Sequence, residues 1–358
     1  MSKLTLEETV KRIEPKSKEW EEKAAKHVEA LAMPPWALGD VCRLGVKIAG
    51  MQRTVNIDVS KKMIFTMAAD HGVADEGVSA FPQEVTVEMM RNIALGGAGV
   101  NVLGRAAGVQ VRLVDMAVKE DFPDLVEKGV IVDHKITHCS ENMRKGPAMT
   151  REQAIAAVEA GIDLADKAIN IEGVKMLGTG ELGIGNTTPA SAVVAVMGGY
   201  PIEDITGRGT GVDDDGLRNK IQVIKDAIKL NQPDPNDAID VLSKVGGYDI
   251  AGIAGTILGA AANKTPVVVD GFISTAGALI AKGICPEAAD YMIASHKSEE
   301  PGHALMWKTL EMKPLLDLGF RLGEGTGAAV AMHICECSAR IMNDMLTFEE
   351  AEVTNANA

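Results

Sequence analysis

Several features that mark large classes of protein are scarce in this sequence. Aromatic residues make up only 3% of the 358 residues, and the formal net charge is −14 without a basic stripe, so nucleic-acid binding is not expected. No apolar run reaches the roughly 18 residues that a membrane-spanning helix needs, and the charged, amphipathic start is not typical of a signal peptide. The five cysteines are scattered, which favours reduced thiols in a cytoplasmic protein.

Glycine is plentiful instead, and many of the 37 glycines follow short apolar runs. These strand-like runs occur at 61–72, 109–118, 174–183, 265–272 and 291–296. Helical segments lie between them, and the one at 151–169 begins with a capping box of Thr150 and Gln153. The repetition predicts an α/β fold, a Rossmann-like, mostly parallel sheet with flanking helices. Ligands of such sheets bind beyond the carboxyl ends of the strands.

The two ends of the chain lie outside this alternation. Residues 4–30 have a helical period that Pro34 and Pro35 end, and 37–50 forms a second helical segment. At the other end, 327–353 is typical of one long helix. We therefore expect two domains: a Rossmann-like catalytic domain over residues 37–330, and a small helical domain made of residues 1–36 with 331–358.

The stretch LGTGELGIGNTTPASAVVAVMGG (177–199) carries the strongest signal of a binding site. A strand leads into four glycines, and Asn186, Thr187 or Thr188 can cap the helix that follows. A helix N-terminus approached through glycines binds anions with its free backbone N–H groups, so phosphate is the expected ligand. A dinucleotide fits less well, because no second strand with an acidic residue follows and Glu181 would repel a pyrophosphate. A purely structural glycine turn is the plain alternative.

A second glycine loop, ITGRGTGVDDDGLRNK (205–220), brackets Arg208 with three glycines. Three consecutive aspartates, 213–215, suit either Mg²⁺ or the N-terminus of the next helix, and helix capping is the commoner reason for Asp there. Lys220 can reach a phosphate held in the first loop, or else lie on a solvated helix face.

Other candidates are weaker. His134, His138 and Cys139 lie close in sequence, but their strand-like flanks would separate them, so we predict no metal site. The Asp70-His71 pair at a strand end is either catalytic or simply orders its loop, and the pattern does not distinguish these.

Six segments, in order along the chain, together resemble one known family. They are ADHGVADEGVSAFPQEVT (69–86), GELGIGNTTPASA (180–192), GRGTG (207–211), LNQPDPNDAIDVLSKVGGYDIAGIAG (230–255), VVDGFISTAGAL (268–279) and RLGEGTGAA (321–329). The sequence from about residue 20 to 345 is similar to the nicotinate-nucleotide:dimethylbenzimidazole phosphoribosyltransferases. The resemblance implies transfer of the phosphoribosyl group of nicotinate mononucleotide to an aromatic base. With dimethylbenzimidazole the products are alpha-ribazole phosphate and nicotinate. It also implies no metal or organic cofactor, and a dimer.

The resemblance also implies roles for individual residues. The family's catalytic Glu maps onto Glu324, which lies between two glycines where a strand-like run turns into a small-residue helix. Its phosphate-loop Glu maps onto Glu181, with Gly183 beside it, and a family Lys maps onto Lys220. Its base pocket follows D-H-G, which gives Ser79, Phe81, Val85 and Met89 as candidate lining, or as ordinary core residues. From the loop pattern we add Gly185, Asn186, Thr187 and Arg208 as substrate-binding residues.

Two alternatives stay open at this point. In the first, the protein carries out the same reaction on a purine, a plain benzimidazole, or a phenol or cresol. An enzyme for phenols would be one subunit of a related pair, and hence part of a heterodimer instead of the expected homodimer. The chain can also be a non-catalytic relative that binds nucleotide. Retention of Glu324, Glu181 and Lys220 argues against a pure binding protein.

Overall fold

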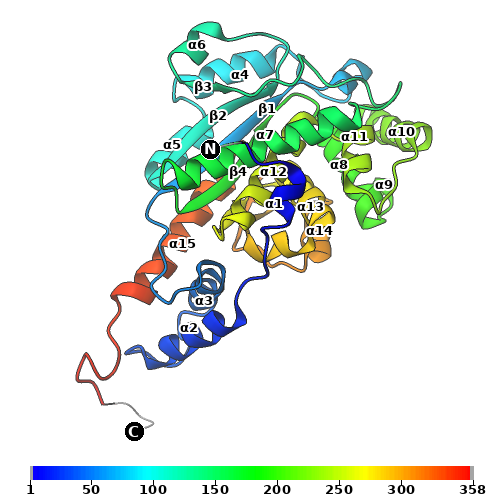
Figure 1. Cartoon of the computed structure of the whole chain (residues 1–358). Coiled ribbons are helices and arrows are strands. Elements are labelled where there is room, and N and C mark those ends of the chain that lie inside the picture. The colour runs from blue at the N-terminus through cyan, green and yellow to red at the C-terminus, as the bar shows by residue number, and fades with distance from the viewer. Residues whose placement is uncertain (1–2, 355–358) are drawn as a thin grey trace.

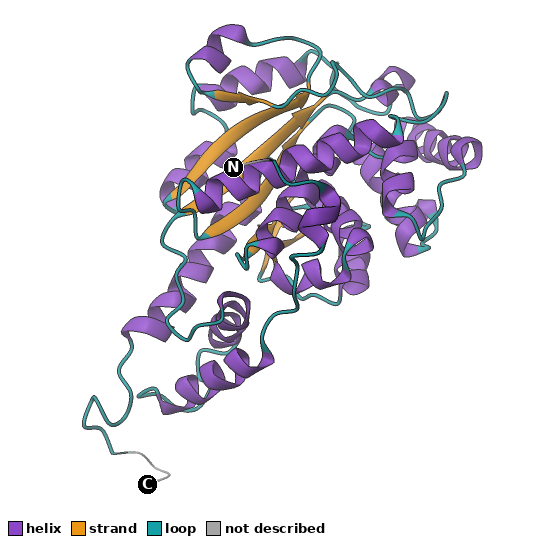
Figure 2. Cartoon of the chain, viewed as in Figure 1, coloured by secondary structure: helices purple, strands orange, loops and turns teal. Residues whose placement is uncertain are grey.

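The structure, a computed structural model, describes residues 3–354 and is built around a six-stranded sheet (Figures 1 and 2). The strand order is β3-β2-β1-β4-β5-β6, and every neighbouring pair is parallel. The strands are β1 (Lys62–Ala69), β2 (Val109–Ala117), β3 (Ile131–Asp133), β4 (Met176–Leu182), β5 (Val267–Val269) and β6 (Met292–Ala294). This confirms the predicted Rossmann-like α/β class.

Helices cover both faces of the sheet, so β1 is buried along its whole length. On one face, Met67 of β1 points toward Gly252 of α12 (Tyr248–Ala262). On the other face, Ile64 of β1 lies near Gly325, which precedes α15 (Thr326–Asp344). Burial of both faces explains why the strands are apolar runs without polar alternation. The capping box predicted for 151–169 is present at the start of α7 (Arg151–Asn170), which packs on α12.

The remaining elements complete these layers. The helices are α1 (Leu6–Val10), α2 (Lys18–Ala30), α3 (Asp40–Gln52), α4 (Val85–Ala94), α5 (Gly99–Ala106), α6 (Pro123–Glu127), α8 (Thr187–Gly198), α9 (Ile202–Ile205), α10 (Asp214–Asn231), α11 (Ala238–Val245), α13 (Phe272–Ile284) and α14 (His303–Leu310). Two 3₁₀ helices, η1 (Gly72–Glu76) and η2 (Pro286–Tyr291), and a separate two-stranded parallel sheet of β7 (His296–Ser298) and β8 (Leu316–Phe320) are also present.

Two helices near the N-terminus pack with the C-terminal helix, away from the sheet (Figure 1). His27 of α2 makes a hydrogen bond of 2.8 Å to the carbonyl of Met342, and Ser338 of α15 donates to the carbonyl of Val41 in α3. By contrast, α1 packs on α12 and α7. A small helical group from both chain ends is therefore present, whereas its predicted bounds, 1–36 with 331–358, stay a prediction.

The long helix predicted over 327–353 is wrong at its end. Helix α15 stops at Asp344, because Met345 adopts an extended conformation and Thr347 starts a new turn by accepting the N–H of Glu350. The predicted start of the next helix, residue 37, is also wrong. Helix α3 begins at Asp40, directly after Gly39, whose positive φ is not helical.

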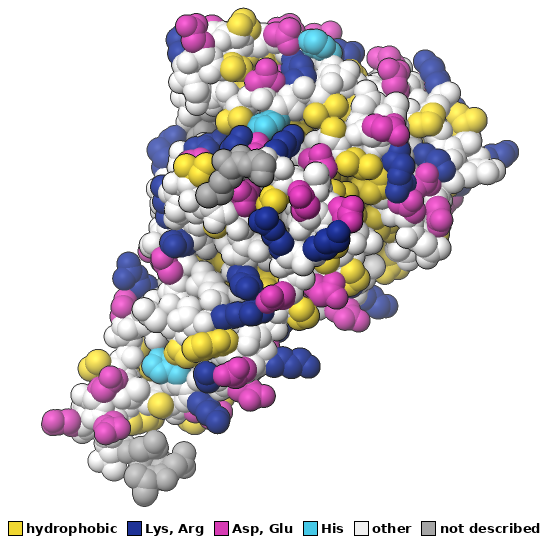
Figure 3. All heavy atoms as spheres, in the orientation of Figure 1, with side chains coloured by type: hydrophobic (Ala, Val, Ile, Leu, Met, Phe, Trp, Pro, Cys, Tyr) yellow, Lys and Arg dark blue, Asp and Glu magenta, His cyan; other side chains and the backbone are white. Residues whose placement is uncertain are grey.

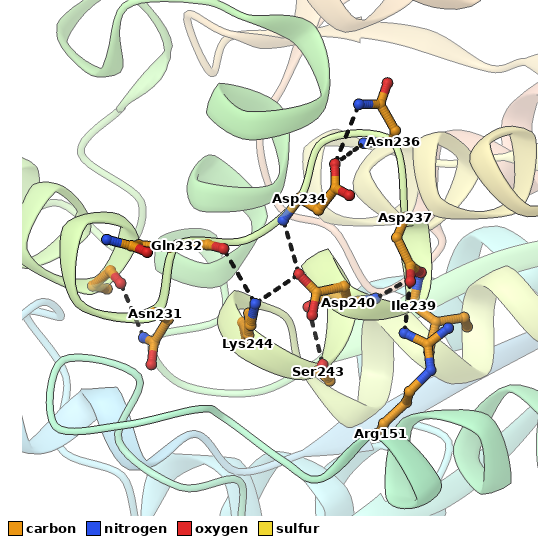
Figure 4. A network of polar contacts seen from close by, with 11 residues as sticks. Arg151, Asn231, Gln232, Asp234, Asn236, Asp237, Ile239, Asp240, Ser243 and Lys244 are labelled. Atoms are coloured by element: carbon orange, nitrogen blue, oxygen red, sulfur yellow. Dashed lines mark hydrogen bonds and ion pairs between the residues drawn. The ribbon is translucent and has the colours of Figure 1, made fainter.

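A polar network fixes the connection between α10 and α11 (Figure 4). Asp237 accepts N–H groups of the first turn of α11 and pairs with Arg151 of α7 at 2.8 Å. One turn on, Asp240 accepts from Lys244 at 2.9 Å and from the backbone of Asp234 at 2.8 Å. These contacts join α11 to α7 and to the segment that follows α10.

The surface and the cysteines agree with the composition. On the face shown in Figure 3, acidic and basic side chains are intermixed. All five cysteines are free. Within residues 3–354, no helix combines the length and the apolar character needed to cross a membrane.

Candidate active site

Polar side chains from neighbouring strands meet at the carboxyl edge of the sheet, where the topology predicts ligands. Asp70 and His71 follow β1, Glu181 lies near the end of β4, and Asp270 follows β5. All four are buried, and Asp270 has no exposed surface. The charged residues of the edge are therefore inside the protein, where each needs a partner.

Glu324 occupies the turn between β8 and α15 in a backbone conformation that is rare for its residue type. Its φ is +63°, between Gly323 at +83° and Gly325 at +102°. Such a left-handed non-glycine residue costs of order 1 kcal/mol or more and persists only where its surroundings enforce it. Here the Glu324 carbonyl accepts a 2.9 Å hydrogen bond from Thr66 of β1, and it packs on Gly180 of β4. The sheet itself thus holds the turn.

The carboxylate of Glu324 lies at the N-terminus of α5. Its Oε2 accepts the N–H of Val100 at 3.2 Å, and the side chain is buried with 5% of the residue exposed. Burial raises the pKa of Glu324, the N–H of Val100 opposes this by favouring the charged form, and the nearby Asp270 adds to the increase. We predicted a helix N-terminus at this carboxylate but not that α5 supplies it. The small-residue stretch 96–99 was the signal in the sequence that could have indicated this contact, since it lets the N-terminus of α5 come close to Glu324.

Asp270 is a second carboxylate that the sequence analysis did not single out. Its Oδ2 accepts the N–H of Gly325 at 3.0 Å, and its Oδ1 accepts the N–H of Ala328 at 2.9 Å. It therefore caps α15 from the end of β5 and fixes the turn that carries Glu324. Burial raises the pKa of Asp270, and His296, 3.9 Å away, acts in the opposite direction.

Glu181 lies beside this turn and shares a donor with another acid. Its Oε2 accepts from the amide of Asn186, and the same amide nitrogen is 3.3 Å from Oδ2 of Asp249. Burial, together with the charge of Asp249, raises the pKa of Glu181 to about 8. Asn186 is the N-cap residue of α8 as predicted, but its side chain does not cap the helix because it is engaged by these acids.

Lys220 joins the two glycine loops. Its Nζ donates to Thr187 Oγ1 at 2.6 Å and to the carbonyl of Gly207 at 3.2 Å. The residue is fully buried, so the alternative of a solvated helix face is wrong. Burial lowers the pKa of Lys220 to about 8. The Lys220 ammonium, the Thr187 hydroxyl and the N-terminus of α8, which follows Gly183 and the positive φ of Gly185, lie together as a cradle of donors that suits an anion.

Arg208 is the one predicted cation that the structure does not bring into this cradle. Its guanidinium pairs with Asp214 and donates to the carbonyl of Val212 at 2.9 Å. Asp213 caps α10 by accepting the N–H of Gly216 at 2.8 Å, as the commoner interpretation of the three aspartates predicted. Among the residues the structure describes, no group of three potential ligands surrounds a metal position.

The predicted base-pocket residues lie on the loop after η1 and on α4. Ser79 forms a 2.9 Å hydrogen bond with Thr210 of the second glycine loop, and Phe81 has 53% of its surface exposed. Val85 and Met89 are half-buried and one helical turn apart on α4. The helix is tied to the first glycine loop because Thr86 accepts the N–H of Ile184 at 3.1 Å. The candidate pocket residues are therefore connected to both glycine loops.

The histidine and cysteine candidates for zinc are separated. His134 is 3.8 Å from Asp163, whereas the exposed His138 contacts Asp121 at 3.1 Å. Each ring faces a different acid, and the prediction of no metal at this segment stays a prediction.

The chain is a phosphoribosyltransferase by class, because a family model described as Phosphoribosyltransferase matches residues 13–353. The chain is 52% identical to the nicotinate-nucleotide–dimethylbenzimidazole phosphoribosyltransferase of Desulfotalea psychrophila over 350 residues, 98% of each chain. It is 50% identical to that of Geobacter sulfurreducens, covering 98% of this chain and 99% of the relative. The chain therefore belongs to the nicotinate-nucleotide–dimethylbenzimidazole phosphoribosyltransferase family.

Solved structures agree with this assignment. The crystal structure of CobT from Thermus thermophilus superimposes with a TM-score of 0.90 at 41% identity, covering 94% of this chain and all of the other. A second structure from the same organism, named as the phosphoribosyltransferase, gives a TM-score of 0.89 at 39% identity, covering 95% of this chain and all of the other.

Proposed function

We propose that this protein transfers the phosphoribosyl group of nicotinate mononucleotide to a nitrogen of dimethylbenzimidazole, giving alpha-ribazole phosphate and nicotinate. One observation carries the proposal: the buried carboxylate of Glu324 accepts the N–H of Val100 in α5, and its backbone carbonyl is held by Thr66 of β1. This carboxylate lies at the same sheet edge as the phosphate cradle of Lys220 and Thr187. Membership of the family supports the choice of substrates.

The chemistry requires a base more than an acid. The ring nitrogen of nicotinate mononucleotide is cationic, so nicotinate leaves with the electron pair of the broken C–N bond and needs no proton. The benzimidazole nitrogen that bonds to the ribose carbon must lose its proton, and Glu324 accepts it. A positioned general base contributes roughly 10²–10⁴-fold. The negative carboxylate also stabilises positive charge that develops on the ribose.

Lys220 is proposed to hold the phosphate of the donor. Lys220→Met is expected to raise KM for nicotinate mononucleotide about 10- to 100-fold, because a hydrogen bond to a charged group is worth about 1.5–3 kcal/mol. Lys229→Met, on the exposed face of the same helix α10, is the matched control and should leave KM unchanged. Steady-state kinetics with a saturating base would measure both. Equal KM values for the two variants would contradict the assignment of Lys220.

The remaining parts of the proposal concern assembly and location. We propose a homodimer, with a heterodimer of related subunits as the alternative, and a cytoplasmic protein that needs no metal or organic cofactor for this reaction. Light scattering on the purified protein should give twice the 37.8 kDa mass of the chain. A monomeric mass would contradict the dimer.

A panel of acceptor bases tests the reaction itself. The protein is incubated with nicotinate mononucleotide and dimethylbenzimidazole, benzimidazole, adenine, phenol or p-cresol, and nicotinate and new nucleotides are separated by chromatography. Nicotinate release should depend on the base and be fastest with dimethylbenzimidazole. Release that no base stimulates would remove the enzymatic proposal, and a phenol that outcompetes benzimidazole would favour an oxygen-linked product instead.

A further inference from the structure

The carboxyl edge of the sheet holds more acids than the proposed reaction uses. Besides Asp70, the buried carboxyl groups of Glu181, Asp249, Asp270 and Glu324 lie there. Glu324 is the proposed base, and Asp270 caps α15. The mechanism above gives no role to Asp249 of the GGYDIAG segment or to the charge state of Glu181, although a negative charge on Glu181 would repel the phosphate of the donor.

Glu181 and Asp249 both accept from the amide of Asn186, whose nitrogen carries two N–H groups. The single amide nitrogen of Asn186 serves Glu181 Oε2 and Asp249 Oδ2. Asp249 has further support, because its Oδ1 accepts the N–H of Ile250 in the first turn of α12 at 2.9 Å, where the helix dipole favours negative charge. The other oxygen of Glu181, Oε1, lies against Gly323, and no residue within 3–354 donates to it.

His71 is the remaining polar group against this pair. Its Nε2 is 3.4 Å from Asp249 Oδ2, and neither ring nitrogen has a hydrogen-bond partner among the described residues although the side chain is buried. The ring therefore also faces Asp249. Two buried carboxyl groups that share a site do not both ionise readily, so the charge of Asp249 disfavours ionisation of Glu181.

We infer that Asp249 is a positioning residue that keeps Glu181 protonated in the resting enzyme, so that Glu181 donates a hydrogen bond through Oε1 to an oxygen of the phosphoribosyl donor. This inference rests on the proposed function and assigns the charge state of a residue in the same site. It explains how an acid can belong to a phosphate-binding loop: the neutral carboxyl group is a donor, whereas the carboxylate would be a repelling acceptor.

The inference predicts how donor binding depends on pH. The groups that act on Glu181 are Asp249 from α12, Asn186 before α8, Asp270 after β5 and Glu324 before α15. His71, after β1, faces Asp249. Burial and the charge of Asp249 raise the pKa of Glu181 to about 8, so affinity for the donor is high below this pH and falls as the proton is lost above it. Asp249→Asn removes the neighbouring charge, lowers the pKa of Glu181, and should move that loss of affinity to lower pH.

The test measures the Kd of nicotinate mononucleotide from about pH 6 to 9.5 by titration calorimetry. Asp249→Asn should move the alkaline loss of affinity down by about one pH unit or more, the size expected when a like charge is removed. Glu181→Gln keeps a neutral donor, so affinity should stay within a few-fold of wild type at neutral pH, and adding Asp249→Asn to it should shift nothing. Burial lowers the pKa of Lys220 to about 8, so loss of its charge causes a separate decrease in affinity at high pH. This decrease stays in every variant.

Controls and a second readout keep the outcomes distinct. Asp163→Asn, which changes another buried acid, on α7 and paired with Lys167, should leave the pH profile unchanged. Infrared difference spectra of wild type against Glu181→Gln should contain a protonated-carboxyl band at neutral pH that disappears above about pH 8. Its absence, or an Asp249→Asn effect equal at every pH, would overturn the inference. Wild type that releases no nicotinate with any base would instead contradict the proposed function.

Discussion

Glu324→Gln is expected to lower turnover by at least about 100-fold while both substrates still bind. The glutamine oxygen can still accept the N–H of Val100, so the turn keeps its geometry, but the amide cannot take the proton of the incoming base. A general base supplies roughly 10²–10⁴-fold, which sets the expected loss. Turnover at saturating substrate and the two dissociation constants, measured separately, distinguish lost chemistry from lost binding.

The pH dependence and a control sharpen this prediction. Because the base must be ionised, wild-type turnover should fall as pH drops through the pKa of Glu324, which burial raises above the ordinary glutamate value. Glu324→Gln should lack this acid limb. Glu349→Gln, at an exposed glutamate near the C-terminus, should behave as wild type. Near-normal turnover of Glu324→Gln would mean that another group accepts the proton.

Gly180→Ala is expected to cost a similar factor without touching any reacting group. A Cβ at Gly180 would overlap the carbonyl oxygen of Glu324 and stand 2.7 Å from its carbonyl carbon. Both neighbours are backbone atoms, so the turn has to move, and the carboxylate moves with it. A misplacement of about 1 Å can cost about 10²-fold in rate. Overpacking of this kind should also lower the free energy of unfolding by roughly 1–3 kcal/mol.

Gly146→Ala is the matched control. It adds the same methyl group at a glycine with an ordinary φ and no atom within 4 Å of the new Cβ. Turnover and thermal unfolding of this variant should match wild type. If Gly180→Ala folds and turns over like Gly146→Ala, the packing of β4 on the Glu324 turn does not position the base.

The sheet was predictable from the sequence because parallel strands buried on both faces leave continuous apolar runs, as β1 does. For Lys220 the sequence left two interpretations open, and the structure decides between them by placing its Nζ 2.6 Å from Thr187 Oγ1. The support of Glu324 did not follow, because Val100 and Thr66 are remote in sequence and neither carries a motif. Likewise, no local pattern could reveal that Asp214 engages Arg208.

Asp249 illustrates the same limit more sharply. The GGYDIAG segment helped to identify the family, but the sequence did not assign a role to its aspartate. That role depends on α12, which places Asp249 against the amide of Asn186, 63 residues away in the chain. Local patterns identify glycine loops and caps. The charge state of a buried pair depends on burial and on distances between elements, which no spacing in the sequence encodes.

The most direct test of the account is a crystal structure of the protein with dimethylbenzimidazole bound. The account predicts a carboxylate oxygen of Glu324 at hydrogen-bond distance, about 2.6–3.2 Å, from a ring nitrogen of the base. A bound base whose nitrogens both lie too far from Glu324 for a direct hydrogen bond, or for one bridged by a single water, would contradict it.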